Sequence, residues 1–154
     1  MSEKSLEARQ NQITIYTDGG SRGNPGPAAL GVAIGAPLNK GYSKYLGKKT
    51  NNEAEYEAVI FALAKLKALL GSKKCKTLKV IFKMDSDLAV QQLSNQWKIE
   101  GKTIIPLFVK IHNLRMDFNE VEFSHIPREQ NKEADALVNQ ELDKHGHEGG
   151  LFNL

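Results

Sequence analysis

The chain has 154 residues, 40% of them apolar and 25% charged, which suits one domain with its own hydrophobic core. Its formal net charge of +3 permits an anionic partner without requiring one. There is a single cysteine, Cys75, so no internal disulfide can form. Residues 1–12 lack the apolar segment of a signal peptide, and no apolar run of the sequence is long enough to cross a bilayer. We therefore expect a cytoplasmic protein.

The first predicted element is a β-strand over residues 13–18, preceded by a polar leader over residues 1–12. The Ile, Thr and Tyr residues of this stretch are typical of a strand. Asp18 ends it and is followed by a turn with four glycines and two prolines. Such an Asp either closes the turn through backbone amides or presents a carboxylate in a cleft, and this stretch alone leaves both alternatives open.

The remaining elements predict an α/β fold with a five-stranded mixed sheet flanked by helices. A hairpin is expected from strands over 28–34 and 42–46, and a long helix from the Thr50-Asn51-Asn52 cap to Leu70. In chain order, the later predictions are a strand over 78–84, a helix capped by 85–87 and running to about 92, an irregular segment over 97–101, a helix over 103–114, a strand over 121–126 and a helix from Asn131 to about Lys144. The end of the chain, over 146–154, contains three glycines and is expected to be irregular.

Three glutamates of the long helix, Glu53, Glu55 and Glu57, are candidates for a functional carboxylate. The residues three, four and seven positions after each glutamate share its face of the helix. After Glu55 this face is apolar without interruption, after Glu53 it is more mixed, and after Glu57 it is again apolar. The periodicity therefore favours Glu55 without excluding the others. An acid near a helix N-terminus is also stabilised by the helix dipole, whatever its function.

Four acids stand at the ends of predicted strands or the beginnings of predicted helices: Asp18, Glu55, Asp85 and Asp135. Each has a plain structural explanation; Asp85, for instance, is a suitable helix cap. If the first and fourth strands are neighbours, however, the four carboxylates converge at one edge of the sheet. Converging carboxylates repel one another, and Mg²⁺ or Mn²⁺ relieves the repulsion. Two such ions can assist attack of water on a phosphodiester, so the residues lead to the hypothesis of metal-assisted phosphoryl hydrolysis.

Four short segments, taken in order, resemble type 1 ribonuclease H from Ile13 to about Asp143. They are residues 17–27, 50–55, 84–87 and 131–137. The resemblance implies a ribonuclease H-like fold and a ribonuclease H domain over 13–143, with a leader over 1–12 and a tail over 144–154. It also implies that the four carboxylates are catalytic and hold two Mg²⁺ ions, for which Mn²⁺ can substitute, and it selects Glu55 among the glutamates.

In that family the substrate is an RNA–DNA hybrid, whose RNA strand is hydrolysed to leave 5′-phosphate and 3′-hydroxyl ends. The resemblance implies that residues of the glycine turn and of the helix start contact the RNA strand in the minor groove: Gly19, Ser21, Asn24, Asn51 and Asn52. Thr50 matches a contact to a phosphate of the DNA strand. We also expect Gly19, Gly20 and Gly23 to let the backbone approach the nucleic acid closely. Alternatively, Asn51 or Asn52 caps the helix and Asn24 is a turn residue.

The chain departs from many bacterial members in the region that carries their basic protrusion. Here residues 97–102 form a short segment with one tryptophan, and residues 124–131 resemble the archaeal-like and plant-domain branch of the family. Trp97 either stacks on the sugars of the DNA strand or belongs to the core. His125 is the candidate for the family's loop histidine, although its position before Pro127 also fits the last strand.

The leading hypothesis is an endoribonuclease that acts on RNA–DNA hybrids as a monomer, with no membrane partner and no obligate protein partner. One alternative is a catalytically silent module that binds hybrids, and another is a nuclease that also cuts double-stranded RNA. The presence of all four acids disfavours the silent module. A Walker-type phosphate loop is excluded because no Gly-Lys-Ser/Thr follows the first strand.

Overall fold

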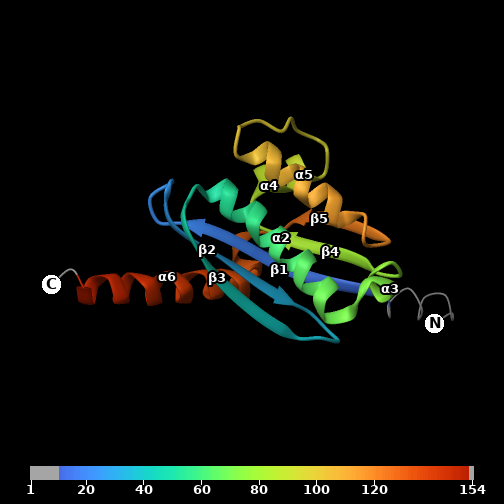
Figure 1. Ribbon diagram of the computed structural model, residues 1–154, viewed down its shortest axis with the longest axis horizontal. Coiled ribbons are helices and arrows are strands. Elements are labelled where there is room, and N and C mark those ends of the chain that lie inside the picture. The colour runs from blue at the N-terminus through green and yellow to red at the C-terminus, as the bar shows by residue number, and fades with distance from the viewer. Residues whose placement is uncertain (1–10, 153–154) are drawn as a thin grey trace.

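The computed structural model describes the backbone of residues 11–152 and the side chains as far as residue 146. Five strands form one sheet in the order β3-β2-β1-β4-β5 (Figure 1). Their bounds are β1 (Gln12–Ser21), β2 (Gly26–Ile34), β3 (Lys40–Lys49), β4 (Lys79–Met84) and β5 (Glu120–His125). β1, β2 and β3 pair antiparallel, whereas β4 pairs parallel with both β1 and β5. The predicted mixed five-stranded sheet is confirmed.

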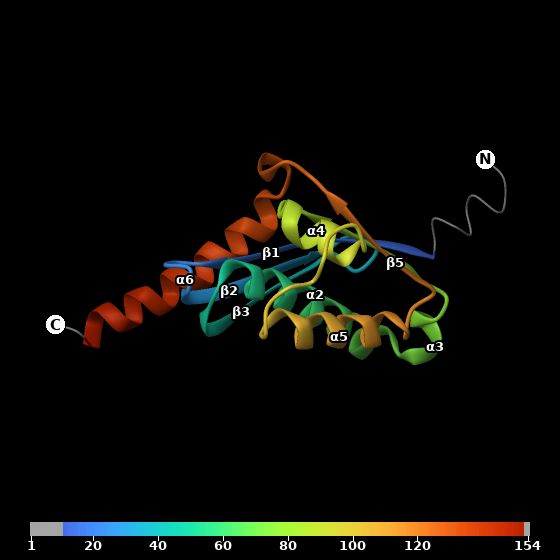
Figure 2. The same ribbon diagram turned by 90° about the horizontal axis from the view of Figure 1, so that it is seen from above.

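Helices cover both faces of this sheet (Figure 2). Their bounds are α2 (Asn51–Leu70), α3 (Ser72–Cys75), α4 (Asp87–Leu93), α5 (Ile104–Arg115), a 3-10 turn η1 (Arg128–Gln130) and α6 (Lys132–Phe152). α2 packs across β1 and β2 with α5 beside it, and α6 packs across the same strands and β3 from the other face. Among residues 11–152, no helix is both long enough and apolar enough to span a membrane.

The main core lies between the sheet and α2. Alternate residues of β1, Ile13 and Ile15, point into it and meet the buried face of α2, which includes Val59, Leu63 and Leu66. Burial of a side chain of this size contributes roughly 1.5–3 kcal/mol, so this face of α2 fixes the helix firmly against the sheet. A smaller apolar cluster, with Ala29, Val138 and Leu142, holds α6 on the opposite face.

The start of α2 is set by a capping box. Thr50 Oγ1 accepts a hydrogen bond from the backbone N–H of Glu53 at 3.1 Å, and the Glu53 carboxylate accepts one from the Thr50 N–H at 3.0 Å. Two of the backbone donors left free at a helix start are thereby satisfied. The helix ends at Gly71, whose N–H donates to Lys67 O. The expected helix from the Thr50 cap to Leu70 is confirmed, and Thr50 rather than Asn51 or Asn52 is the cap.

Two boundaries differ from the sequence-based expectation in ways that affect function. β1 does not stop at Asp18: it continues through Gly19 and Gly20 to Ser21, because β2 supplies a pairing partner for every residue of this stretch. α6 continues through the glycines to Phe152, so the expected irregular end is wrong for residues 146–152. A helical glycine costs only about 0.5–1 kcal/mol, and extending an existing helix needs no new nucleus. Residues 1–10 of the predicted leader lie outside the described residues.

Candidate active site

A cleft opens where the parallel pairing of β1 with β4 ends. The last paired residues are Tyr16 and Lys83, whereas β1 stays paired with β2 as far as Ser21. Asp18 therefore lies on a part of β1 whose β4 side is uncovered, and Asp85 directly follows β4. The parallel arrangement carries both acids to the same edge of the sheet, the usual place for a site in such folds.

Glu55 reaches this edge because α2 rests directly on the backbone of β1 at Gly19. A Cβ atom at Gly19 would overlap with backbone atoms of Ala54 and Glu55, so only glycine allows this approach. The backbone of Gly19 also hydrogen-bonds the Glu55 carboxylate. The sequence led us to expect that this glycine brings the backbone close to nucleic acid; the close approach in the structure is to α2.

Asp135 comes from the first turn of α6, on the opposite face of the sheet from α2. The next glycine of β1, Gly20, faces this helix, and a Cβ there would lie 3.3 Å from Val138 Cγ1. By strand alternation Asp18 points to the same face as Gly20. Gly31, which pairs with Asp18, likewise has no room for a Cβ because Ala134 O occupies that space. Small residues in β1 and β2 thus let α6 bring Asp135 close to Asp18.

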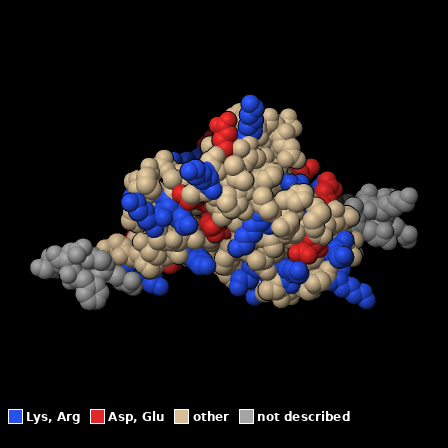
Figure 3. All heavy atoms as spheres, turned by 45° about the horizontal axis from the view of Figure 1, so that its top comes forward, with Lys and Arg blue, Asp and Glu red and all other residues tan. Residues whose placement is uncertain are grey.

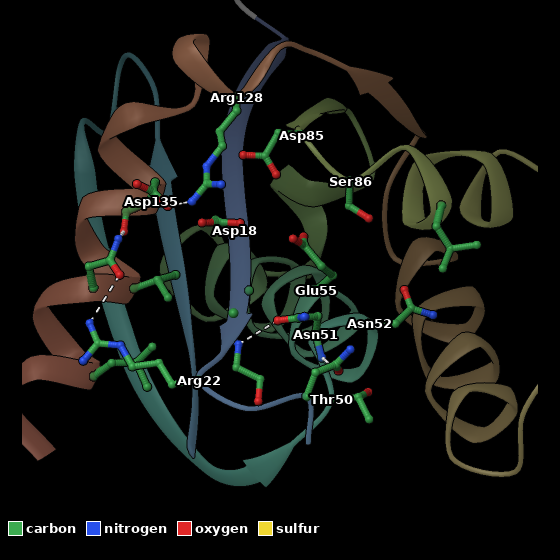
Figure 4. A pocket seen from close by; sticks show the side chains of 18 residues that line it. Asp18, Arg22, Thr50, Asn51, Asn52, Glu55, Asp85, Ser86, Arg128 and Asp135 are labelled. Atoms are coloured by element: carbon green, nitrogen blue, oxygen red, sulfur yellow. Dashed lines mark hydrogen bonds and ion pairs between the residues drawn. The ribbon is translucent and has the colours of Figure 1, made fainter. Parts of the chain in front are cut away.

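The four carboxylates line one pocket of about 750 Å³ (Figure 4). Asp18, Glu55 and Asp85 each offer an oxygen, and these three oxygens lie within 4.8 Å of one another. Asp135 lies on the α6 side of Asp18, and Arg128 extends from η1 between Asp85 and Asp135. Arg128 Nη2 is 3.7 Å from Asp135 Oδ1.

Burial and mutual repulsion make this cluster electrostatically unfavourable in the absence of a cation. Burial, followed by the negative charge of Asp85, raises the pKa of Asp18 from 3.8 to about 7. Burial and the charge of Asp18 raise the pKa of Glu55 well above its ordinary value. Burial also raises the pKa of Asp85, whereas the Asn131 amide and the Arg128 cation oppose that rise. A divalent cation would supply the missing positive charge.

Asn131 connects the cluster to the sheet. It is 1% exposed, and its Nδ2 donates to Thr17 O at 2.9 Å and to Asp85 Oδ2 at 3.4 Å. The chain therefore fixes one oxygen of Asp85 through the residue that precedes α6. We expected Asn131 only to open the last helix; its amide also crosses to two other elements.

The residues predicted to contact substrate form one wall of the same pocket: Gly19, Ser21, Asn24, Thr50, Asn51 and Asn52. Two hydrogen bonds tie the turn after β1 to the start of α2: the Ser21 N–H donates to Asn51 Oδ1 at 2.8 Å, and the Asn51 N–H donates to Asn24 Oδ1 at 2.9 Å. Gly23 permits the turn because its φ of +118° is in the region that favours glycine. The turn therefore belongs to the wall of the pocket.

The two auxiliary candidates lie outside this lining. His125 is the last residue of β5, and its Nε2 lies 3.3 Å from Asp85 O, so it occupies the strand and not the loop. Trp97 lies in the segment after α4 and is 49% exposed, so it is not a core residue. In the loop between β5 and α6, the residue that lies beside the acids is Arg128, which we did not predict from the sequence. The sequence feature that could have indicated it is an arginine just after Pro127, in the short segment between β5 and the helix that carries Asp135.

A family model described as reverse transcriptase-like matches residues 16–141, which is most of the chain. The chain is 31% identical to a ribonuclease H of Paracidovorax citrulli, over 87% of this chain and 96% of that protein. It is 35% identical to ribonuclease HI of Halobacterium salinarum, over 88% of this chain and 66% of that protein. A protein of Mycobacterium tuberculosis named as bifunctional is 34% identical over 86% of this chain, but the chain spans only 36% of its length.

Solved structures agree in fold as well as in sequence. A ribonuclease H1 in complex with an RNA/DNA hybrid has a TM-score of 0.80 and 44% identity, over 86% of this chain and 98% of that one. The ribonuclease H1 of the halophilic archaeon Halobacterium salinarum has a TM-score of 0.77 and 34% identity, over 86% of this chain and 98% of that one. The N-terminal ribonuclease H domain of the M. tuberculosis protein has a TM-score of 0.79 and 32% identity, over 90% of this chain and 98% of that one. Sequence and structure together show that the chain belongs to the ribonuclease HI family.

Proposed function

We propose that this protein hydrolyses the RNA strand of RNA–DNA hybrids with the help of divalent metal ions, leaving 5′-phosphate and 3′-hydroxyl ends. The observation that carries the proposal is the convergence of Asp18, Glu55 and Asp85, with oxygens within 4.8 Å of one another, in a pocket shared with Asp135. A related ribonuclease H1, 44% identical, is known in complex with an RNA/DNA hybrid.

The residues of the pocket fit a pair of Mg²⁺ or Mn²⁺ ions. Carboxylate oxygens are the ligands these ions prefer, and Asp18, Glu55, Asp85 and Asp135 would hold them. Glu55 Oε2 is buried without a hydrogen-bond partner, as expected of an atom that serves as a metal ligand. When bound, such ions activate water as the nucleophile and stabilise the charge of the leaving oxygen.

The wall beside the carboxylates suits the RNA strand. Asn51 uses its Oδ1 to accept from Ser21, so its Nδ2 is the part of the amide that remains to donate to a ligand. Acceptors for such a donor line the minor groove, where the 2′-hydroxyls also distinguish RNA from DNA. Asn24 and Asn52 would complete the RNA-facing side, and Thr50, at the start of α2, would contact a phosphate of the DNA strand.

Positive charge around the acids would support phosphate binding. Lysine and arginine side chains are spread over the face shown in Figure 3, with acidic side chains between them. Lys48 and Lys49 directly precede Thr50 on the chain, and Arg22 lines the pocket. Contacts from such cations to phosphates contribute affinity and little sequence preference, which suits an enzyme that acts on hybrids of any sequence.

We place this activity in a domain of residues 13–143 that acts as a monomer in the cytoplasm. The lone cysteine, Cys75, is buried and so takes no part in a disulfide between subunits. Trp97 would stack on sugars of the DNA strand, since its indole is half exposed beside the pocket-lining helix α4. His125 would act in product release only if β5 frays at its end.

The decisive experiment compares cleavage of an end-labelled RNA–DNA hybrid, a double-stranded RNA and a single-stranded RNA of one sequence. Each substrate is tested with Mg²⁺, with Mn²⁺ and with EDTA, and product ends are identified by their response to a phosphatase and a ligase. We expect metal-dependent cleavage of the hybrid, and no cleavage by Asp18→Asn. Hybrid binding without cleavage by the wild-type protein would instead support a silent binding module, and equal cleavage of double-stranded RNA would widen the substrate class.

A further inference from the structure

Four residues line the α6 side of the pocket, and neither the acids nor the expected RNA contacts account for them: Arg22, Val138, Asn139 and Leu142. Arg22 is the one cation of these four, and its side chain is 47% exposed. In Figure 4 it lies on the same side of the pocket as Asp135, across from Thr50. This side of the pocket therefore presents one accessible positive charge among uncharged side chains.

Two oxygens of α6 hold the guanidinium of Arg22. Its Nη2 is 2.6 Å from Asp143 Oδ1 and donates to Asn139 Oδ1 at 3.4 Å. Asn139 is itself fixed, because its Nδ2 donates to the backbone oxygen of Asp135 at 3.1 Å and its Oδ1 is thereby turned toward Arg22. Both contacts use Nη2, and the guanidinium carries further N–H donors on Nε and Nη1 that suit a phosphate.

The arrangement directs the cation, and not the carboxylate, at a ligand. Arg22 lines the pocket, whereas Asp143 does not. The side chains of the pair are 47% and 70% exposed, and an ion pair so exposed contributes little to the stability of the fold. It does restrict the guanidinium to one orientation. A side chain that is already oriented loses less conformational freedom when it binds, so the pair favours binding of an anion by Arg22.

The spacing along α6 indicates which anion this is. Asp135, Asn139 and Asp143 are four residues apart and form one row on the helix, in which each step advances about 6 Å along the axis. Arg22 Nη2 contacts the second and third members of this row, so it lies roughly 6–12 Å along the axis from the catalytic candidate Asp135. Phosphates of one nucleic-acid strand repeat at intervals of the same order. When the scissile phosphate lies at the acids, a near neighbour on the same strand therefore reaches Arg22.

We propose that Arg22 binds a phosphate of the RNA strand one or two linkages from the scissile bond, and that Asp143 and Asn139 position it. The proposal rests on the proposed function. It goes beyond that function by adding a phosphate subsite on the α6 side of the pocket and by giving the second half of α6 a part in substrate binding. The simpler alternative is that the ion pair only fastens the turn after β1 to α6.

The test removes the charge of one phosphate at a time. Hybrids carry a single methylphosphonate, which is uncharged, at successive linkages of either strand. The reference for each has an ordinary phosphate and the same 2′-deoxy sugar before that linkage. The ratio of the two kcat/KM values for cleavage at one bond, identified by product length, is the penalty for that linkage. Because each penalty is obtained with one enzyme, a partly unfolded variant still gives a valid value.

Three variants separate the two explanations. The wild type should show a penalty of about tenfold or more at one linkage of the RNA strand near the cut, the worth of a hydrogen bond to a charged group. Arg22→Ala should reduce this penalty to below about twofold, and Asp143→Ala should reduce it by about threefold, since the guanidinium is then present but not oriented. Lys144→Ala is the matched control: it removes an exposed cation from the same helix and should leave the penalty unchanged.

The proposal is overturned if Arg22→Ala slows cleavage equally at every linkage, if the penalty that it removes lies on the DNA strand, or if Lys144→Ala removes the same penalty. An unchanged penalty in Asp143→Ala would overturn the positioning role of α6. A wild-type protein that cleaves no hybrid would overturn the proposed function alone. The same scan can then be measured as binding affinity, by fluorescence anisotropy in EDTA, so the two failures are distinguishable.

Discussion

Gly19 and Ala54 are in such close contact that no side chain fits between them: a Cβ atom at Gly19 would overlap with the carbonyl group of Ala54. The obstructing atoms are backbone, so α2 itself would have to move. We expect Gly19→Ala to lower the free energy of unfolding by about 2 kcal/mol or more, as overpacking does. Displacement of Glu55 by about 1 Å should also reduce cleavage by roughly a hundredfold.

Thermal unfolding followed by circular dichroism, together with cleavage of a labelled hybrid, tests this expectation. Gly146→Ala is the matched control, because Gly146 is helical and nothing lies within 4 Å of its Cβ position. That variant should be neutral or more stable by up to about 1 kcal/mol. If Gly19→Ala unfolds at the same temperature as the wild type, α2 does not rest directly on the backbone of β1 at Gly19.

The second prediction concerns the two neighbouring glutamates of α2. Glu53 is committed to its own helix, where its carboxylate accepts from the Thr50 N–H at 3.0 Å, and glutamine can accept the same bond. Glu53→Gln should therefore leave cleavage within about threefold of wild type, whereas Glu55→Gln should reduce it by about a hundredfold or more. Steady-state cleavage at saturating Mg²⁺ measures both, and the reverse ranking would refute the assignment of Glu55.

The contrast between Glu53 and Glu55 also shows how far the sequence can lead. Helical periodicity favoured Glu55, and Thr50 followed three residues later by Glu53 marks a capping box, so both are local signals. The link from Asn131 to Asp85 is not local: it spans 46 residues, and no spacing rule indicates which buried amide will meet which carboxylate. Strand alternation could place Asp18 on one face, but only the pairing of β1 with β2 beyond Tyr16 shows that its β4 side is open.

The third prediction is that Asp18→Asn stabilises the protein when no metal is bound. Burial and the nearby charge of Asp85 raise the pKa of Asp18 to about 7, so at pH 8 the wild-type protein must keep an unfavourable carboxylate ionised. The amide has a similar shape and no charge. We expect the variant to gain about 2–4 kcal/mol in EDTA at pH 8, although its cleavage activity is lost.

Denaturant unfolding at pH 8 in EDTA gives this difference directly. Glu133→Gln is the control, since Glu133 is an exposed acid on the same helix as Asp135 and should change stability little. In saturating Mg²⁺ the advantage of Asp18→Asn should shrink or reverse, because the wild-type cluster then gains bound cations that the variant holds less well. An Asp18→Asn protein less stable than wild type in EDTA would contradict the electrostatic account.

The fourth prediction follows from the sign of the same shifts. The folded-state pKa values of Asp18, Glu55 and Asp85 are all raised, so the folded state retains protons that the unfolded state has already lost. For Asp18, whose pKa rises from 3.8 to about 7, the window lies between these two values: its protonated form contributes stability at low pH that is lost as the pH rises through about 7. In EDTA, the free energy of unfolding of the wild type should decline across this window more steeply than that of Asp18→Asn. Parallel curves for the two proteins would contradict the prediction.

The last prediction concerns Arg128, whose cation opposes the effect of burial on Asp85. Burial raises the pKa of Asp85, and Arg128 lowers it. Arg128→Ala should therefore raise that pKa further and move the acidic limb of the pH–rate profile to higher pH, because Asp85 must be ionised to hold a metal ion. Arg128→Lys keeps the charge and should largely preserve the profile.

Cleavage rates from pH 5 to 9 at subsaturating Mg²⁺ would show this displacement, which we expect to be about half a unit or more for Arg128→Ala. Lys144→Ala, which removes an exposed cation from α6 outside the pocket lining, controls for the change in net charge. The comparison also separates two roles of the guanidinium. A uniform loss of rate at every pH in Arg128→Ala, shared by Arg128→Lys, would mean that Arg128 acts through its hydrogen-bonding geometry, toward Asp135 or the substrate, and not through its charge on Asp85.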